Sequence, residues 1–468
     1  MKVEQIYTGC LAEAAYYIES NGEVAIIDPL RETAPYLAKA EADGAKIKYV
    51  LETHFHADFV SGHVDLAKKA GATIIYGPNA STTYDIHQAV DNEEFKLGKA
   101  TIKVLHTPGH TMESTCYLLI DEEGNDHAIF TGDTLFIGDV GRPDLAQKSE
   151  VTMNDLAGIL YDSLRNKIMK LNDNLIVYPA HGAGSACGKN MSSQTWDTLG
   201  NQKATNYALR ADMTKEEFVK EVTTGILPPP QYFQKNAIIN KSGYESLDVV
   251  MERGNIPLNA ETFEAMANHQ GALVLDTRSK EDFTKSHIPN SIFIGIDGGF
   301  APWVGALITD IEQAIIFVAD AGKEEEVVMR LSRVGYDNTL GYLDGGLEGW
   351  VAAGKETDSI QGVTAEQMET RLSSEKIEVL DSRKPGEYEA EHMDGAISMP
   401  LDYINQSSSE LDKESPIFVH CRSGYRSLVF ISIMKGRGYH NLIDVQGGFS
   451  AMKETGLPIC DNSCTSEN

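Results

Sequence analysis

The sequence has few cysteines, few basic residues and no long hydrophobic run. Six cysteines in 468 residues are too sparse for a disulfide framework, so we expect reduced thiols in a cytoplasmic protein. No run approaches the ~18 apolar residues that a transmembrane helix needs. Residues 1–7 have no apolar segment typical of a secretory signal. We therefore expect no membrane association.

Basic residues are outnumbered by acidic ones. The chain has 40 Lys and Arg against 69 Asp and Glu, a formal net charge of −29. This excess of negative charge argues against nucleic acid as a partner, because binding to the phosphate backbone requires clustered Lys and Arg. The length is too great for one hydrophobic core and predicts two to four domains.

Histidine and aspartate cluster directly after an apolar run at residues 49–51. Residues 53–59 are Thr-His-Phe-His-Ala-Asp-Phe, and the run before them is typical of a strand that delivers side chains to its C-terminal edge. Three later segments share this plan and end in His110, Asp133 and His181. A single such histidine is usually a core residue, but four segments in this order indicate a metal site.

The first half of the chain alternates strand-like and helical patterns. Apolar residues recur at helical spacing over 33–42, 60–70, 156–169 and 196–222. Residues 228–230 are three prolines, which cannot continue a helix. We expect the segment from there to about residue 255 to be a terminal helix followed by a linker.

The motif His-x-His-x-Asp, followed by His110, Asp133 and His181, resembles the metallo-β-lactamase superfamily, whose fold has two sheets sandwiched between helices. The resemblance implies such a domain over residues 1–250. Within the superfamily, residues 53–58 and Gly-Arg-Pro-Asp at 141–144 are similar to the persulfide dioxygenases, whose relatives are the glyoxalase II thioester hydrolases.

The resemblance to persulfide dioxygenases implies one mononuclear Fe(II) per chain, held by His54, His110 and Asp133. This two-histidine, one-carboxylate face leaves open positions for substrate sulfur and O2. The neighbouring residues then orient ligands or substrate by hydrogen bonding. They are His56, Asp58 and His181.

The hydrolase relatives hold a second metal, with ligands that match Asp58, the residue after it and His181. That middle residue is Phe59 in this chain, which cannot bind a metal. A dinuclear hydrolytic site is therefore disfavoured, although the sequence alone leaves zinc open.

Two further residues are candidate substrate contacts in this domain. Arg142 lies on a loop with glycine and could pair with a carboxylate on the thiol that carries the persulfide; a solvated loop arginine is the alternative. Cys187 lies in a loop of small residues that lets backbone approach a ligand closely. It could relay sulfur near the metal, but we favour a buried inert thiol.

The second half of the chain is an internal repeat. Leu-Asp-Thr-Arg at 275–278 recurs as Leu-Asp-Ser-Arg at 380–383, at an offset of roughly one hundred residues, the size of a small domain. Each copy alternates strand-like and helical patterns and resembles the rhodanese fold. We therefore expect an α/β multidomain protein, a metallo-β-lactamase αββα sandwich followed by two rhodanese-like α/β domains at 255–355 and 361–462.

The second copy contains a cysteine loop, His-Cys-Arg-Ser-Gly-Tyr-Arg-Ser at 420–427. Cys421 would meet backbone N–H groups at a helix N-terminus, with Arg422 and Arg426 nearby, and all of these stabilise a thiolate. The same cradle would stabilise a persulfide and bind sulfite. Cys-x4-Arg is one residue shorter than the phosphate loop of the related phosphatases, so a sulfur species fits better. A structural cysteine is the alternative.

The first copy has no such cysteine. Aligning residues 317–318 with 418–419 places Asp320 opposite Cys421. A carboxylate cannot carry a persulfide, so we expect this copy to be inactive and kept for packing, orientation or partner contact. Cys460 and Cys464 near the C-terminus form either a redox pair or incidental thiols of an exposed tail.

The whole arrangement resembles bacterial fusions of a persulfide dioxygenase and a sulfurtransferase. The resemblance implies oxidation of a low-molecular-weight thiol persulfide with O2 to sulfite, and transfer of a sulfane sulfur from Cys421 to sulfite, giving thiosulfate in sulfide detoxification. The expected partners are these small molecules and further copies of the chain in a homo-oligomer. Two alternatives remain, a zinc thioester hydrolase with an appended sulfurtransferase and a non-oxidative sulfur carrier or sensor.

Overall fold

The computed structural model describes residues 1–146, 151–407 and 411–461. The chain divides into two compact units. The first comprises Met1–Val249 with Ser332–Gly335, and the second comprises Val250–Leu331 with Tyr336–Asn468. Within the described residues, no helix is both long enough and apolar enough to cross a membrane.

Two six-stranded sheets form the centre of the first unit. The first sheet has its strands in chain order: β1 (Lys2–Thr8), β2 (Glu13–Ser20), β3 (Glu23–Ile27), β4 (Lys46–Leu51), β5 (Thr73–Tyr76) and β6 (His87–Gln88). The second has the order β12-β11-β10-β9-β8-β7. Its strands are β7 (Glu94–Leu97), β8 (Ala100–His106), β9 (Thr115–Ile120), β10 (Asp126–Gly132), β11 (Ile176–Pro179) and β12 (Asp197–Thr198).

Strand β2 shows how the sequence builds the layers. Successive side chains of a strand point to opposite faces, and all but one of the β2 residues are buried. Tyr16 and Ile18 pack in the core between the two sheets, whereas Ala15 and Tyr17 pack in the core beneath the helices of the first sheet. Because both faces of the sheet are covered, β2 has an almost continuous apolar sequence.

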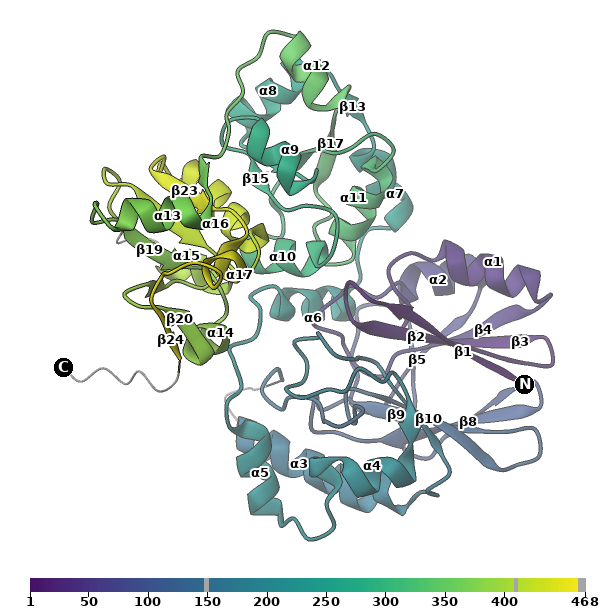
Figure 1. The fold of residues 1–468 in the computed structure, drawn as a ribbon. Helices are drawn as coiled ribbons and strands as arrows, with labels where there is room; N and C mark the ends of the chain where they lie inside the picture. The colour runs from purple at the N-terminus through teal and green to yellow at the C-terminus, as the bar shows by residue number, and fades with distance from the viewer. Residues whose placement is uncertain (147–150, 408–410, 462–468) are drawn as a thin grey trace. The chain divides into compact units, whose positions relative to one another are not determined.

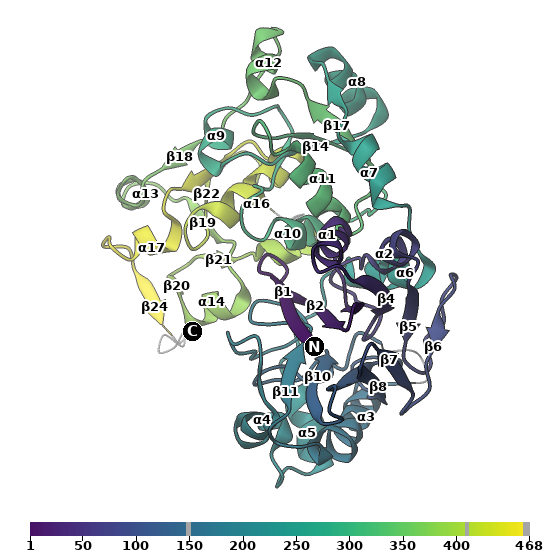
Figure 2. The same cartoon turned by 90° about the vertical axis from the view of Figure 1, so that its right-hand side faces the viewer.

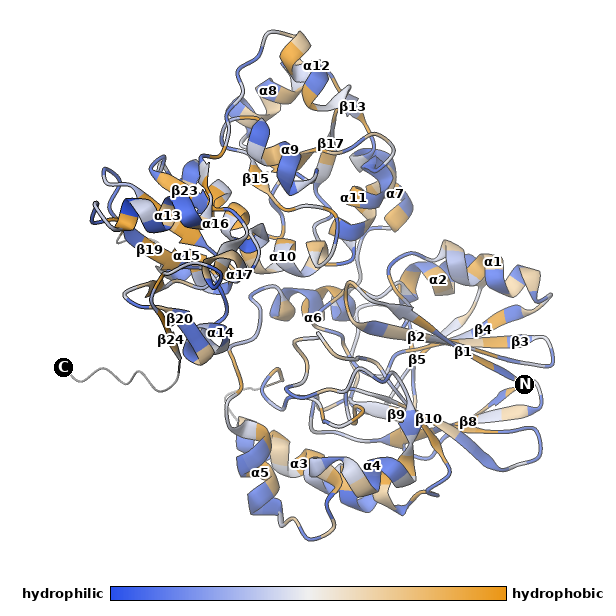
Figure 3. Ribbon diagram, viewed as in Figure 1, coloured by the Kyte–Doolittle hydropathy of each residue, from blue (hydrophilic) through white to orange (hydrophobic). Residues whose placement is uncertain are grey.

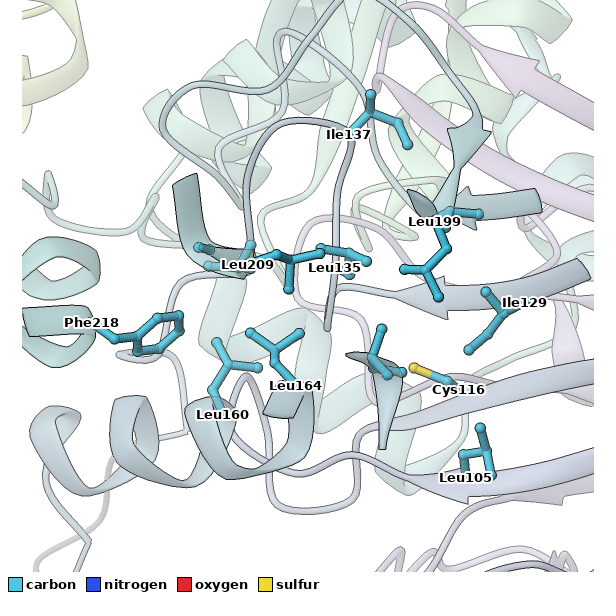
Figure 4. Packing of buried hydrophobic residues seen from close by; sticks show 14 of the residues in the cluster. Leu105, Cys116, Ile129, Leu135, Ile137, Leu160, Leu164, Leu199, Leu209 and Phe218 are labelled. Carbon is cyan, nitrogen blue, oxygen red and sulfur yellow. The ribbon is translucent and has the colours of Figure 1, made fainter. Parts of the chain in front are cut away.

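Helices cover the outer face of each sheet (Figure 1). The first sheet packs against α1 (Ala34–Ala42) and α2 (His63–Ala70), and the second against α3 (Met153–Asn166), α4 (Leu199–Thr205) and α5 (Lys215–Thr223). These helices carry both hydrophilic and hydrophobic residues (Figure 3), as expected of helices with one buried face. In Figure 4, Leu160 and Leu164 of α3 point into the cluster that also holds Phe218 of α5. The result is the expected αββα sandwich.

The sequence predictions differ from the structure in two segments of this unit. The helix expected over 196–222 is interrupted, because β12, α4, a 3-10 helix at Tyr207–Leu209 and α5 follow one another there. The single terminal helix expected after the prolines is two helices, α6 (Phe233–Ser242) and α7 (Leu247–Gly254). A further 3-10 helix, Ile168–Lys170, follows α3.

Two five-stranded sheets of identical order form the second unit. The first has the order β13-β17-β16-β14-β15, with β13 (Pro257–Leu258), β14 (Leu273–Asp276), β15 (Ile292–Phe293), β16 (Ile315–Val318) and β17 (Thr339–Leu343). The second has the order β18-β23-β22-β19-β21, with β18 (Gly362–Val363), β19 (Glu378–Asp381), β21 (Ile397–Ser398), β22 (Ile417–His420) and β23 (Leu442–Val445). Neighbouring strands of both sheets pair in parallel, as the repeat predicts.

Helices connect these parallel strands. The first copy contains α8 (Ala260–Gln270), α9 (Lys280–Lys285), α10 (Phe300–Leu307), α11 (Glu324–Ser332) and α12 (Gly346–Ala352). The second contains α13 (Ala365–Leu372), α14 (Pro385–Ala390), the 3-10 helix Leu401–Tyr403, α15 (Ile404–Ser407), α16 (Tyr425–Gly436) and α17 (Gly448–Met452). A small antiparallel pair, β20 (Glu391–Met393) and β24 (Ile459–Asp461), completes it. Figure 2 shows α16 beside β22.

The strand register corrects the alignment of the two copies. Asp276 pairs with Val318 in the first sheet, and the equivalent Asp381 pairs with His420 in the second. The residue after Val318 is Ala319, so alanine stands where the second copy has Cys421. The expectation of Asp320 at this position was wrong by one residue. Sequence similarity alone does not fix the alignment of two such short strands to within one residue.

Candidate metal centre and cysteine loop

Three strand ends of the first unit deliver the expected metal ligands. His54 follows β4, His110 follows β8 and Asp133 follows β10 directly. One atom of each side chain lies within 4.8 Å of the others, and all three residues are buried. The two sheets therefore bring together ligands that are far apart in the sequence.

The geometry leaves one carboxylate oxygen facing both imidazoles. Asp133 Oδ2 lies 3.4 Å from His110 Nε2 and 3.8 Å from His54 Nε2. This buried oxygen has no hydrogen-bond partner. An unpartnered buried carboxylate oxygen is costly, and a cation between the three atoms would remove that cost. The donor set therefore fits a metal ion.

Hydrogen bonds orient both imidazoles toward this point. His110 Nδ1 lies 2.8 Å from the carbonyl oxygen of Arg142, and His54 Nδ1 lies 3.0 Å from Thr53 Oγ1. Thr53 donates its hydroxyl to Asp28, so its oxygen accepts from His54. An Nδ1–H that is engaged in this way leaves Nε2 as the free ligand atom. Burial also lowers the pKa of His54 well below its usual value, which keeps the ring neutral.

Glycines allow the chain to approach this centre closely. Gly132, with a φ of +51°, ends β10, and a Cβ there would lie 2.6 Å from the Thr53 side chain. A Cβ at Gly141 would lie 2.0 Å from the Asp133 carbonyl oxygen and 2.9 Å from His110 Nδ1. Both positions therefore require glycine.

His181 bridges two carboxylates. Its Nδ1 lies 2.7 Å from Asp133 Oδ1, and its Nε2 lies 2.8 Å from Asp58 Oδ2. Burial by itself would lower the pKa of His181, but the charges of Asp133 and Asp58 hold this pKa well above its usual value. His181 therefore lies between Asp133 and Asp58, where both carboxylates favour its protonated form.

His56 lies beside the buried acids of the first sheet. Its Nε2 lies 3.1 Å from Asp28 Oδ1 and 3.6 Å from Glu52 Oε2. The Phe59 ring is fully buried, with its centroid 4.4 Å from that of His56. His56, Asp58 and His181 nevertheless offer atoms within 4.8 Å of one another. The aromatic ring thus lies against the second group of possible ligands.

The guanidinium of Arg142 is already paired with groups of the same chain. Its Nε and one terminal nitrogen each lie 2.7 Å from a carboxylate oxygen of Asp144. The guanidinium also donates to the carbonyl oxygens of Ala186 and Leu227. Asp144 therefore fills the bidentate face of Arg142 in this structure, and a contact of Arg142 with a substrate carboxylate stays a prediction. The main-chain carbonyl of Arg142 orients His110.

Cys187 is buried within reach of the metal group. Its sulfur and ligand atoms of Asp133 and His181 lie within 4.8 Å of one another. Burial raises the pKa of the Cys187 thiol well above its usual value, and the charges of Asp58 and Asp133 add to this effect. Burial therefore disfavours the thiolate of Cys187, and its interpretation as an inert thiol stays a prediction.

Sequence reasoning missed the residues that support the ligands. Asp28 accepts from both the Thr53 N–H and its hydroxyl, and Glu52 accepts from the Ser61 hydroxyl. A signal for Asp28 was present, because it follows the apolar strand β3 just as the ligands follow theirs. Glu52 carries the same signal, because it directly follows β4.

The cysteine loop of the second unit has the expected form. Cys421 follows β22, and α16 begins four residues later. The Gly424 N–H donates to Cys421 Sγ over 3.1 Å. A Cβ at Gly448 would lie 2.4 Å from the Cys421 carbonyl oxygen, so glycine is needed where α17 meets the loop.

The two loop arginines have different surroundings. Arg426 donates both terminal nitrogens to Glu387, at 2.5 and 2.9 Å. This bond to Arg426 lowers the pKa of Glu387. Arg422 is exposed. An incoming anion would therefore meet Arg422 directly, whereas Arg426 would first have to leave Glu387 or bind with it.

The first copy packs against the loop-bearing helix of the second. The Tyr425 hydroxyl donates to the Gly295 carbonyl, and the Phe293 N–H donates to Ser432 Oγ. The Phe293 and Tyr425 rings meet edge to face. These contacts suit a role in packing and orientation. Cys460 is half-buried, and Cys464 lies outside the described residues.

Comparison with known families gives two matches. Residues 8–181 match the metallo-beta-lactamase superfamily, and residues 259–353 and 364–455 each match the rhodanese-like domain. These matches lie inside the domain ranges expected from the sequence; the ranges themselves stay predictions.

Relatives of two activities are similar to the first half of the chain. The cytoplasmic hydroxyacylglutathione hydrolase of Arabidopsis thaliana is 36% identical over 138 residues, which cover 28% of this chain and 53% of the hydrolase. The mitochondrial persulfide dioxygenase of Homo sapiens is 31% identical over 212 residues, which cover 45% of this chain and 74% of the dioxygenase. The chain thus spans little more than half the length of the hydrolase.

One solved structure is similar over more of the chain. A metallo-beta-lactamase from Staphylococcus aureus subsp. aureus COL is 31% identical, with a TM-score of 0.63, and the match covers 73% of this chain and 98% of that protein. The likeness therefore extends beyond the superfamily match at residues 8–181.

Proposed function

We propose that this chain, which belongs to the metallo-β-lactamase superfamily, is an Fe(II) persulfide dioxygenase coupled to a sulfurtransferase. The sulfurtransferase would be one of the rhodanese-like domains that follow its metallo-β-lactamase domain. The proposed reaction oxidises a low-molecular-weight thiol persulfide with O2 to sulfite and converts the sulfite to thiosulfate. Small-molecule partners, cytoplasmic location and a homo-oligomeric state stay predictions.

This proposal depends on the second group of possible ligands, His56, Asp58 and His181, which is poorly suited to hold a second metal ion. Relatives with hydrolase and dioxygenase names are similar at 36% and 31% identity, so identity does not choose between the activities. In this chain Phe59 cannot bind a metal, and both nitrogens of His181 are engaged by carboxylates. A single ion held by His54, His110 and Asp133 is therefore favoured.

The protein's own residues would prepare this centre. His181 holds Asp133 Oδ1, so that only Oδ2 is presented to the metal. The Arg142 carbonyl and Thr53 hold the two imidazoles in the tautomer that binds through Nε2. Fe(II) at this face would supply open coordination positions for substrate sulfur and O2. The sulfane sulfur would give up the four electrons that O2 accepts.

The second step would take place at Cys421. Its sulfur carries the sulfane sulfur, and the Gly424 N–H at 3.1 Å stabilises negative charge on Cys421 Sγ. Sulfite attacks the outer sulfur, the S–S bond breaks, and its electron pair returns to Cys421. Both sites in one chain raise the effective concentration of sulfite at the loop.

Metal analysis and oxygen uptake test the proposal. The full-length protein purified without oxygen should contain about one iron per chain. It should consume O2 only when a thiol persulfide is added, with glutathione, coenzyme A and bacillithiol persulfides as the probes. Bound zinc, no persulfide-dependent O2 uptake and hydrolysis of a glutathione thioester would refute it.

One observation favours the zinc hydrolase alternative. His56, Asp58 and His181 are close enough to share an ion, provided that His181 releases Asp58. Two zinc ions per chain in the native protein would support this alternative, and one iron per chain with persulfide-dependent O2 uptake would exclude it.

A further inference from the structure

The sulfur of Cys421 contacts a buried hydroxyl–carboxyl pair. Ser427 Oγ lies 3.7 Å from Cys421 Sγ and 2.7 Å from Asp444 Oδ1. Ser427 lies on α16 and Asp444 on the neighbouring strand β23. All three residues are buried. The chain thus places a carboxyl one hydroxyl group away from the reactive sulfur.

Asp444 is an unusual residue for this position. A buried carboxylate normally has a paired cation or several donors, and the side-chain hydrogen bond that Asp444 accepts comes from a neutral serine. Burial raises the pKa of Asp444 to about 6, against the lowering effects of the Ser427 bond and the Lys280 charge. Both protonation states are therefore accessible near neutral pH.

The single hydroxyl proton of Ser427 couples this carboxyl to the sulfur. When Asp444 is ionised, Ser427 donates to it and turns an oxygen lone pair toward Cys421, which favours the thiol. When Asp444 is protonated, its own O–H can donate to Ser427. The serine proton then turns toward the sulfur and favours the thiolate.

We propose that Asp444, acting through Ser427, is a positioning residue that holds the proton exchanged with Cys421 during sulfur transfer. This inference rests on the proposed sulfurtransferase function and names the group that controls its protons. It also gives Ser427 a role beyond that of a residue buried in α16.

The proposed steps balance in protons and electrons. On loading, Cys421 Sγ attacks the outer sulfur of a thiol persulfide, the donor S–S bond breaks, and its electron pair leaves on the donor thiolate. The Cys421 proton passes through Ser427 to the Asp444 carboxylate. On unloading, sulfite takes the outer sulfur, the electron pair returns to Cys421, and Asp444 returns the proton. The S–H proton of the transferred sulfur leaves to solvent as thiosulfate forms, and the donor thiolate takes up one proton from solvent. Neither step needs an oxidant or reductant.

Other charged groups surround this arrangement and would modulate it. Lys280 of α9 acts on the Asp444 carboxyl, and Arg426 of α16 interacts with Cys421 while paired with Glu387 of α14. Lys280 belongs to the first rhodanese-like copy, and its Nζ lies 3.4 Å from the Ser423 carbonyl oxygen. The copy without a cysteine thus contributes a charge to the loop of the other.

The test is the pH dependence of Cys421 alkylation in the full-length protein. Iodoacetamide labelling is quantified on the Cys421 peptide by mass spectrometry from pH 4.5 to 9. The wild-type rate should rise in two steps, one of them near pH 6. Asp444→Asn should show one step shifted to lower pH, because the neutral amide removes a negative charge near the sulfur and its NH2 group can donate to Ser427 at every pH. Alkylation below the midpoint should then be about tenfold faster.

Matched variants separate the relay from a general loop distortion. Ser427→Ala should show one step shifted to higher pH, because no hydroxyl remains to stabilise the thiolate, and Ser427→Thr should restore two steps. Asp394→Asn, an exposed carboxyl of the same domain, should match the wild type. Loading with glutathione persulfide should follow the same profiles.

Several outcomes would overturn the relay. A wild-type profile without a step near pH 6 does so even if a variant fails to fold. Shifts of Asp444→Asn and Ser427→Ala in the same direction would show a structural effect only. Alkylation needs no sulfur substrate, so this result is independent of the proposed function, whose failure would appear as absent thiosulfate formation.

Discussion

Replacement of Phe59 by histidine tests why the site would hold one metal. The ring is fully buried and lies 4.4 Å from the His56 ring, at the position that follows Asp58. Phe59→His supplies the missing nitrogen without adding volume. We expect the variant to bind two ions per chain in zinc-containing medium, whereas the wild type binds one.

The free energy of unfolding shows how large the effect of a second bound ion on the Phe59→His variant should be. Without a second ion, Phe59→His loses apolar burial and leaves an imidazole without a partner, at a cost of about 2–4 kcal/mol. His181 must also release Asp58, whose Oδ2 lies 2.8 Å from its Nε2. Free zinc at 100 times the dissociation constant of the new site returns about 2.7 kcal/mol. The unfolding free energy of the variant should therefore depend steeply on zinc.

The assay combines metal analysis with urea unfolding of iron-loaded protein at several zinc concentrations. Phe59→Leu is the control, because leucine keeps the site apolar and offers no ligand. Its stability should not respond to zinc beyond the wild-type response. If Phe59→His still binds one ion, or if the wild type already binds two, the aromatic ring is not what excludes the second metal.

Three further predictions follow from the two sites. His110→Ala removes one of three metal ligands, so metal content and persulfide-dependent O2 uptake should fall at least tenfold. Cys421 should still accept sulfur from a persulfide in this variant. Retained O2 uptake would count against the proposed ligand set. Cys421→Ser should keep O2 uptake at the wild-type rate and release sulfite, measured by ion chromatography, and unchanged thiosulfate output would exclude the proposed division of labour. Burial raises the pKa of Asp444 to about 6 in the folded protein, from an ordinary value of 3.8. The wild-type free energy of unfolding, measured by urea titration at each pH, should therefore fall relative to that of Asp444→Asn as the pH rises from 4 to 6, by at most about 3 kcal/mol. A difference that does not depend on pH would show that the carboxyl does not titrate in this range.

The candidate metal ligands could be predicted because the signal was local. Each follows an apolar strand, and strand ends in such a fold meet at a common edge, so a metal site at this edge could be predicted before any distance was known. The choice of His54, His110 and Asp133 among the candidates came from the resemblance to persulfide dioxygenases. The repeat in the second half was equally visible, since strand and turn residues recur in the same order. These features depend on side-chain periodicity and backbone conformation, which neighbouring residues largely determine.

Tertiary structure decided which of these side chains are free to act. Arg142 has the same sequence signature whether or not Asp144 fills its guanidinium, and the slip of one residue between Asp320 and Ala319 needed the strand register. The contact of Ser427 with Asp444 joins a helix to a strand 17 residues away. Such pairings depend on packing, burial and the low polarity of the interior, none of which is contained in the order of nearby residues.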